Sequence, residues 1–156
     1  MDAEEYRLEE QVGHLLRRAY QRHLALFHGI MSEAEGGAEG GAKGGAKGGV
    51  GPTSMQFAAL VTLWQRGPLS QNLLGRLLAM DPPTVKGVVA RLMARGLVVR
   101  EKDDADARRL RVALTPAALA ALPGWVEKAR AITAATLAPL PRDEAARLVA
   151  TLRRLG

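Results

Sequence analysis

The order of apolar and polar residues predicts a mainly helical chain with one short hairpin. Apolar side chains recur at intervals of three and four residues, the spacing of one helix face, over most of the sequence. Six segments show this spacing: residues 2–31, 53–66, 70–79, 82–95, 116–137 and 142–155. Between 97 and 114 the pattern changes to a β-branched run, a polar loop and an alternating run, which favours two strands. The predicted fold class is therefore mainly α with a small β-hairpin (α+β).

Two short helices joined by a tight turn are predicted near the middle of the chain. Ser70 and Asp81 each carry a side-chain oxygen that can cap the first turn of a helix. Pro82 and Pro83 follow at first-turn positions, where a missing N–H costs nothing. Gly96 can adopt the left-handed conformation that ends a helix. The second helix is expected to direct five apolar side chains inward: Val85, Val88, Val89, Leu92 and Met93.

A β-hairpin with a charged tip is predicted directly after this helix pair. Its first strand begins with the apolar run 97–99, the polar loop 103–109 turns the chain, and apolar residues alternate along 110–114. A further helix before the pair opens with a Thr-x-x-Gln capping box at Thr53 and Gln56. It is expected to bury Phe57, Leu60, Val61 and Trp64. Three helices followed by a hairpin indicate a winged helix-turn-helix.

This arrangement suits the binding of duplex DNA. A helix laid across another by a short turn projects far enough to enter the major groove, with its N-terminal residues nearest the base edges. Thr84 can bond a base edge or a phosphate, and Lys86 and Arg91 can bind phosphates or guanine. Arg108 and Arg109 at the hairpin tip can reach the adjacent minor groove. The alternative is a packed helix pair with a solvated charged loop and no nucleic-acid partner.

The same residues resemble the MarR-type (multiple-antibiotic-resistance regulator) bacterial transcription factors. The matching motifs are GPLSQ at 67–71, VVARLMARGLVVR at 88–100, the wing signature DxxDxR at Asp103, Asp106 and Arg108, and the pair Leu114 and Thr115. The resemblance covers nearly the whole chain. It implies a homodimer that represses, or less often activates, nearby genes at a pseudo-palindromic operator. It also implies that a small anionic aromatic ligand often releases the DNA.

The resemblance implies roles for individual residues as well. The arginine matching Arg108 enters the minor groove, and the aspartate matching Asp106 holds it in place. The candidate DNA-binding residues are Ser70, Gln71, Pro83, Thr84, Lys86, Gly87, Arg91, Asp106, Arg108 and Arg109. The family often has arginine or serine at the position of Gly87, so base readout by that side chain is absent here. Lys86, Thr84 or Arg91 can substitute, or recognition can rest on DNA shape.

Both chain ends are predicted to form a dimerisation region. We expect an N-terminal dimerisation helix within 1–33, a glycine-rich flexible loop over 34–52, the winged helix-turn-helix domain over 53–115 and C-terminal dimerisation helices over 116–156. Alanine-rich helices with leucine stripes suit an intertwined helical dimer. The alternative is that these helices complete the core of a monomer. The glycine density of the loop disfavours regular structure and departs from the family pattern.

Charge and composition narrow the choice of partner. The chain has 22 Lys+Arg against 16 Asp+Glu and a net charge of +6, which favours a polyanion. Cysteine is absent, which excludes disulfides, thiolate metal sites and the peroxide-sensing branch of the resembled family. Only 4% of residues are aromatic, so base stacking on single strands is not supported. Without an apolar run of about 18 residues, and with an acidic N-terminal segment, we expect a cytoplasmic protein without a membrane partner.

No cofactor, metal or catalytic site is expected. His14, His23 and His28 are nine and five residues apart, a spacing that does not stack ligands on one helix face. The sequence contains no nucleophile elbow, phosphate-binding loop or metalloprotease motif. The resemblance suggests an effector pocket between the dimerisation helices and the DNA-binding lobe. Its candidates are His14, Arg17, Trp64 and Trp125, although both tryptophans can equally belong to the core.

The predicted function is a homodimeric, sequence-specific regulator, and more specifically a repressor, that binds double-stranded DNA and is not an enzyme. Two alternatives stay open. The first is a winged-helix protein-interaction module, which would show no salt-dependent affinity for DNA. The second is a nonspecific architectural DNA binder. The modest and mixed charge speaks against the second, because such binders usually mass their positive charge.

Overall fold

The computed structural model describes residues 6–33 and 51–156. A 3-10 turn, Leu8–Glu10 (η2), precedes α1 (Val12–Ser32), and α2 (Ser54–Arg66), α3 (Gln71–Leu77) and α4 (Pro82–Ala94) follow. Strands β1 (Val98–Lys102) and β2 (Leu110–Leu114) form an antiparallel pair, and α5 (Pro116–Leu137) and α6 (Arg142–Leu155) complete the chain. The predicted mainly helical fold with one hairpin is confirmed.

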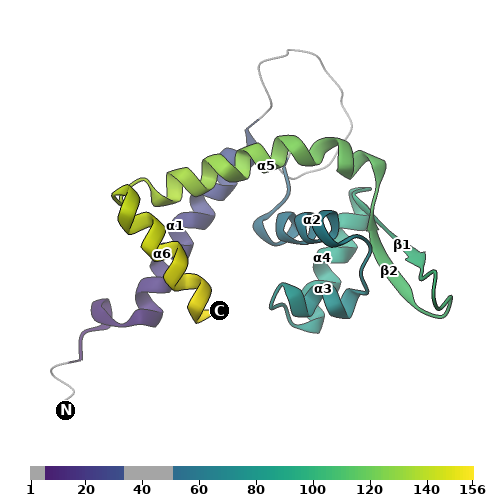
Figure 1. Ribbon diagram of the computed structural model, residues 1–156, viewed down its shortest axis with the longest axis horizontal. Coiled ribbons are helices and arrows are strands. Elements are labelled where there is room, and N and C mark those ends of the chain that lie inside the picture. Colours follow the sequence, from purple (N-terminus) through teal and green to yellow (C-terminus); the bar gives the residue numbers. More distant parts are fainter. Residues whose placement is uncertain (1–5, 34–50) are drawn as a thin grey trace.

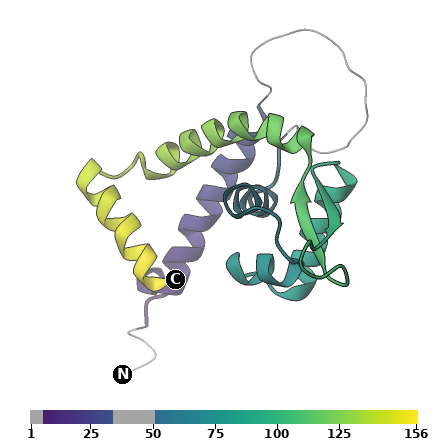
Figure 2. The same cartoon turned by 45° about the vertical axis from the view of Figure 1, so that its right-hand side comes forward.

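The described elements form two lobes that α5 connects (Figure 1). One lobe contains α2, α3, α4 and the hairpin, and the other contains α1 and α6 (Figures 1 and 2). Helix α1 is fastened to α5 by the guanidinium of Arg22, which donates to the carbonyl oxygens of Ala135 at 3.1 Å and Thr136 at 2.7 Å. Phe27 and Met31 bury the C-terminal half of α1 in the core.

A continuous hydrophobic core extends from the helix-turn-helix to α5. Its members come from every helix except α6, and from both strands: Phe27, Met31, Ala59, Leu60, Leu63, Leu74, Val85, Val88, Val89, Leu92, Leu97, Val98, Val112, Ala118, Leu122, Trp125 and Ile132. Helices α3 and α4 approach closely at Gly75. A Cβ there would lie 3.1 Å from Cγ1 of Val85, so a residue without a side chain allows the contact.

The helix ends follow the capping chemistry that the sequence predicts. Thr53 and Gln56 form the reciprocal capping box, and Thr115 accepts a hydrogen bond from the Ala118 N–H at 3.2 Å. Gly96, just after α4, adopts a left-handed φ of 69°. These local bonds fix where α2, α4 and α5 begin or end. They therefore also fix the lengths of the connections between them.

The predicted helix of residues 2–31 was wrong over residues 6–11, and its residues 2–5 lie outside the described residues. Helix α1 begins at Val12 because Gln11 has an extended backbone (φ −80°, ψ 128°). The Gln11 side chain instead donates to the carbonyl oxygen of Arg7 at 3.1 Å, which stabilises the short η2 turn. The predicted glycine-rich loop lies outside the described residues apart from Gly51 and Pro52.

Two side chains that were expected in the core are exposed. Met93 is 40% exposed because it lies one residue beyond the buried face of α4, and one residue rotates a helix by about 100°. Trp64 is 53% exposed and lines a surface hollow between α2 and α5. The buried faces of α2 and α4 are therefore narrower than the apolar pattern suggests.

The register of α4 predicts different costs for adjacent truncations. Leu92→Ala should lower the free energy of unfolding by about 2–5 kcal/mol, because Leu92 is fully buried and its loss leaves a cavity. Met93→Ala is the matched control on the same helix and should cost less than about 1 kcal/mol. Urea denaturation at fixed chain concentration measures both changes. Equal losses for the two variants would contradict the register.

Candidate nucleic-acid interface

The orientation of α4 depends on the caps and on the turn that precedes it. Ser70 Oγ accepts from the Leu73 N–H at 3.2 Å at the start of α3, and Asp81 Oδ1 accepts from the Thr84 N–H at 2.7 Å at the start of α4. Hydrogen bonding from the side chain and the backbone N–H of Thr84 lowers the pKa of Asp81, so this cap stays charged to a lower pH than an ordinary aspartate. Ala79 turns the chain between the helices with a positive φ of 51°.

The outer face of α4 carries small and cationic side chains. Pro83, Lys86, Ala90 and Arg91 are exposed, and Thr84 and Gly87 are half-buried. Among residues 6–33 and 51–156, the structure contains no hydrogen bond or ion pair of the Lys86 or Arg91 side chain. Both cations are therefore available to an anionic partner.

The tip of the hairpin is organised by Asp103. Its Oδ1 accepts from the backbone N–H groups of Ala105 at 2.8 Å and Asp106 at 3.3 Å, which closes the turn. Its Oδ2 lies 3.4 Å from Nε of Arg111. The Ala105 N–H, together with the Arg111 charge, holds the pKa of the Asp103 carboxyl below its ordinary value although partial burial opposes the shift. Asp103 is therefore a structural residue of the wing.

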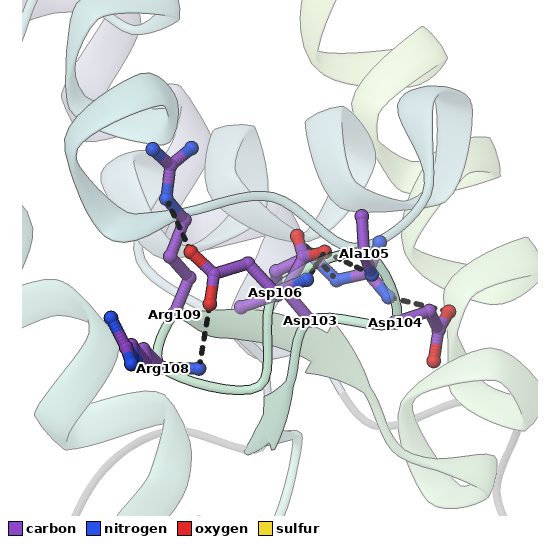
Figure 3. A network of polar contacts seen from close by, with 7 residues as sticks. Asp103, Asp104, Ala105, Asp106, Arg108 and Arg109 are labelled. Atoms are coloured by element: carbon purple, nitrogen blue, oxygen red, sulfur yellow. Dashed lines mark hydrogen bonds and ion pairs between the residues drawn. The ribbon is translucent and has the colours of Figure 1, made fainter.

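Asp106 contacts both arginines of the tip, as Figure 3 shows. Its Oδ1 accepts from the Arg108 backbone N–H at 3.0 Å, and its Oδ2 lies 3.5 Å from Nε of Arg109. The Asp106 carboxylate thus positions the backbone of Arg108 and the side chain of Arg109. The Arg108 guanidinium has no hydrogen bond or ion pair within the described chain and extends away from the loop (Figure 3).

Further polar contacts hold the wing at its base. Nη2 of Arg111 donates to Oδ2 of Asp104 at 2.8 Å. Nε of Arg111 is buried without a hydrogen bond, and the Asp103 carboxylate nearby offsets the burial of the guanidinium charge. Nη2 of Arg100 donates to Oε1 of Gln71 at 2.8 Å, which ties β1 to the first turn of α3. The sequence interpretation missed Arg100 and Arg111. The partner of Arg100 comes from a distant segment, and the partners of Arg111 lie in a turn whose geometry cannot be predicted from the sequence.

The backbone adds a second connection between the wing and the helix pair. Leu69, just before α3, exchanges two hydrogen bonds with Val112 of β2, at 3.1 Å and 2.7 Å. The structure thus places the predicted residues of α3, α4 and the hairpin tip on one connected framework. Ser70 and Gln71 have internal partners there, whereas Lys86, Arg91 and Arg108 project as cations.

Three adjoining hollows lie between α2 and α5, and one of them extends to α1. The largest has a volume of about 470 Å³, and Phe57, Val61, Trp64, Val126 and Arg130 are among its lining residues. Of the four predicted effector residues, Trp64 lines two of these hollows. Trp125 is a core residue, and neither His14 nor Arg17 lines any of the three.

The sequence interpretation missed two cationic or titratable groups at these hollows. Arg130 lines two of them, and its Nη1 donates to Oε1 of Glu127 at 2.5 Å. His23 lines the third, and its Nδ1 lies 3.0 Å from Oγ1 of Thr136. That hydroxyl donates to the carbonyl oxygen of Ile132, so the neutral His23 ring is expected to carry its proton on Nδ1.

The described residues contain neither a metal-binding cluster nor a membrane-spanning helix. No cluster of three His, Asp or Glu side chains in residues 6–33 and 51–156 could hold a metal ion. None of the helices in those two ranges is long and apolar enough to cross a membrane. The candidate sites in the described residues are therefore the exposed cations of α4 and the hairpin tip, and the apolar hollows between α2 and α5.

The fold and the exposed cations define a winged helix-turn-helix protein. Residues 53–110 match the model of the MarR family. The HTH-type transcriptional repressor NicR of Pseudomonas putida is 35% identical over 155 residues, which are 99% of this chain and 88% of NicR. The chain belongs to the MarR family.

Solved structures of related proteins have the same fold. A probable transcriptional regulator from Pseudomonas aeruginosa is 44% identical with a TM-score of 0.82, over 96% of this chain and all of that one. BpsR of Bordetella bronchiseptica, whose DNA binding is regulated by 6-hydroxynicotinic acid, is 36% identical with a TM-score of 0.79, over 96% of each chain.

The Asp103 turn makes a prediction about pH. Because the folded-state pKa is depressed, the carboxylate stabilises the wing above the ordinary aspartate pKa of about 3.9, and this contribution is lost as the pH falls through the folded value. The NMR chemical shift of the Ala105 amide proton should therefore change with pH as Asp103 titrates, with a midpoint below about pH 3.9. Asp103→Asn should remove the transition. A midpoint at or above the ordinary value would contradict the assigned hydrogen bonds.

Proposed function

We propose that the protein is a homodimeric repressor that binds a specific sequence in double-stranded DNA. The observation that carries this proposal is the placement of three cations that have no partner among the described residues, Lys86 and Arg91 on α4 and Arg108 at the wing tip. A helix face with free cations suits the major groove, and a guanidinium on a projecting loop suits the adjacent minor groove. The relatives, which include the repressor NicR, support a regulatory role.

The proposed DNA contacts divide into two kinds. Thr84, Lys86, Gly87 and Arg91 lie on the outward face of α4, which we assign to the major groove. Pro83 precedes them in the first helical turn. The wing residues act together: Arg108 enters the minor groove, Asp106 orients the tip, and Arg109 binds phosphate. Ser70 and Gln71 lie at the start of α3, where they support these contacts through the cap and the bond to Arg100.

A homodimer would cover apolar surface that the single chain leaves exposed. Helix α6 contains no buried residue, although Leu148, Val149 and Leu152 recur on one side of it. The apolar side chains at the start of the chain are also exposed: Leu8, Val12, Leu15, Leu16 and Tyr20. An amphipathic helix whose apolar face is mostly exposed favours association, because that face is otherwise in water. A second copy of the chain is the simplest partner, since its two recognition helices would then face two half-sites.

The hollows between α2 and α5 suit a small aromatic acid that releases the DNA. Phe57, Val61 and Trp64 offer an apolar wall to a ring, and Arg130 offers a cation to a carboxylate. The Arg130 ion pair with Glu127 is exposed, so a ligand can replace it at little cost. Because BpsR responds to 6-hydroxynicotinic acid, this compound is the probe of choice.

Arg108→Ala tests the DNA contact. It should weaken binding to a duplex selected by the wild-type protein by about 1–3 kcal/mol, because the minor-groove contact is lost. Arg130→Ala removes an exposed arginine from α5 and should leave the affinity unchanged in the absence of ligand. Fluorescence anisotropy across a salt series measures both. If Arg108→Ala binds as tightly as the wild type, the assignment of Arg108 to the minor groove is wrong. If the wild-type protein shows no salt-dependent binding to DNA, a protein-interaction module is favoured instead.

Arg130→Ala also tests the effector site. 6-Hydroxynicotinic acid should release the selected duplex from the wild-type protein, and the variant should need about tenfold more ligand because a charge-assisted hydrogen bond is lost. Glu127→Ala is the matched control and should respond at the same or a lower concentration. The neutral 6-hydroxynicotinamide should be a weaker inducer. An unchanged response of the Arg130 variant would place the carboxylate elsewhere.

A further inference from the structure

Gly87 lies in the interior of α4, where no packing contact requires a glycine. A Cβ at Gly75 would press on Val85, but in the described part of the chain a Cβ at Gly87 would meet one atom within 4 Å apart from the backbone of its own helix. That atom is Nη2 of Arg91, at 3.9 Å. Glycine in the interior of a helix is destabilising, because it loses more backbone entropy on folding than any other residue. The role of Gly87 therefore lies at the exposed face of α4 and not in the packing of the core.

The missing side chain leaves room for Arg91. Residues 87 and 91 are one turn apart on the same face, and long helical side chains lean toward the N-terminus over the preceding turn. The Arg91 guanidinium accordingly lies beside Gly87, one turn nearer the N-terminal end of α4 than its own Cα. The N-terminal end of a recognition helix is the part that lies closest to base edges.

The other polar side chains of this face are less suited to reading a base. Arg91 is exposed and has no hydrogen bond or ion pair within the described residues, so all its donors are available. Lys86 is also exposed, but an ammonium group does not present the planar fork that matches two acceptors at once. Thr84 is half-buried, and both its side chain and its backbone N–H are hydrogen bonded to Asp81. Arginine pairs with O6 and N7 of guanine in the major groove.

We propose that Arg91, lying across the space left by Gly87, reads a guanine in each half-site and is the main determinant of base preference. This inference rests on the proposed function and adds the residue and the base that carry specificity. Gly87 acts as a positioning residue, because any large side chain there would occupy the place of the guanidinium. Lys86 then contributes phosphate binding without base preference.

The experiment compares base preferences rather than affinities alone. Wild-type protein first selects duplexes from a randomised pool, and affinities are then measured for the selected duplex and for single-pair substitutions of it. One G·C pair in each half-site should be preferred by about 5- to 150-fold. Arg91→Ala and Arg91→Lys should both reduce this preference to near unity, while preferences at the other positions remain.

The Gly87 variants separate displacement of Arg91 from other effects. Gly87→Ala adds a methyl group at ordinary contact distance and should keep the preference. Gly87→Leu should lose it as Arg91→Ala does, and Gly87→Leu combined with Arg91→Ala should lose no more than Arg91→Ala alone. Thermal denaturation of each variant checks that α4 remains folded. Lys86→Ala is the matched control, and it should weaken all duplexes equally.

The outcomes distinguish this inference from the proposed function. If Arg91→Ala weakens all duplexes by the same factor, Arg91 binds phosphate and the inference is overturned while the regulator stands. If Gly87→Leu retains the full preference, the positioning role of Gly87 is overturned. If the wild-type protein selects no sequence at all, the proposed function itself fails.

Discussion

The close packing of α4 on α3 is the constraint on which the cationic surface depends. Gly75 allows the two helices to meet at Val85, and branched side chains along one face of α4 are fully buried. Burying each such side chain contributes about 1.5–3 kcal/mol, so α4 has one stable rotation about its axis. Lys86 and Arg91 are exposed because the opposite face is buried. The position of these cations is therefore a consequence of core packing.

The wing is held by a different kind of interaction. It presents little apolar surface at its tip, and its shape comes from carboxylates that accept backbone and guanidinium hydrogen bonds. Asp103 closes the turn and Asp106 positions the chain at Arg108. The arginines of this region thus have two roles. Arg100 and Arg111 are paired within the protein and shape the wing, whereas Arg108 extends outward and remains available.

Helix α5 connects the two lobes, and through it the proposed DNA-binding surface is joined to the rest of the molecule. This helix begins directly after the wing and is followed by α6 (Figure 1). Its side chains line the hollows beside α2. In the proposed dimer, a ligand between α2 and α5 would change the relative position of the two DNA-binding lobes. Such a ligand acts only if it binds one arrangement of the lobes better than the other.

Much of the fold could be predicted because its signals are local. Capping by Ser70, Asp81 and Thr115 acts over three residues, and the helical and alternating patterns act over a few turns. The missed features depend on contacts between distant segments. The hydrogen bond between Gln71 and Arg100 cannot be predicted from the sequence. Nor can the exposure of Trp64 in a hollow between α2 and α5, which Arg130 also lines. The start of α1 was missed because a side-chain bond of Gln11 competes with helical geometry.

The most direct test of the central claim is the dependence of binding on half-site spacing. Two recognition helices of one dimer must enter major grooves about 34 Å apart, one helical turn of DNA. Light scattering should give two chains per selected duplex, and inserting about five base pairs between the half-sites should abolish tight binding because one half-site turns to the opposite face. One chain per duplex, with affinity unaffected by the insertion, would contradict the proposed homodimeric regulator.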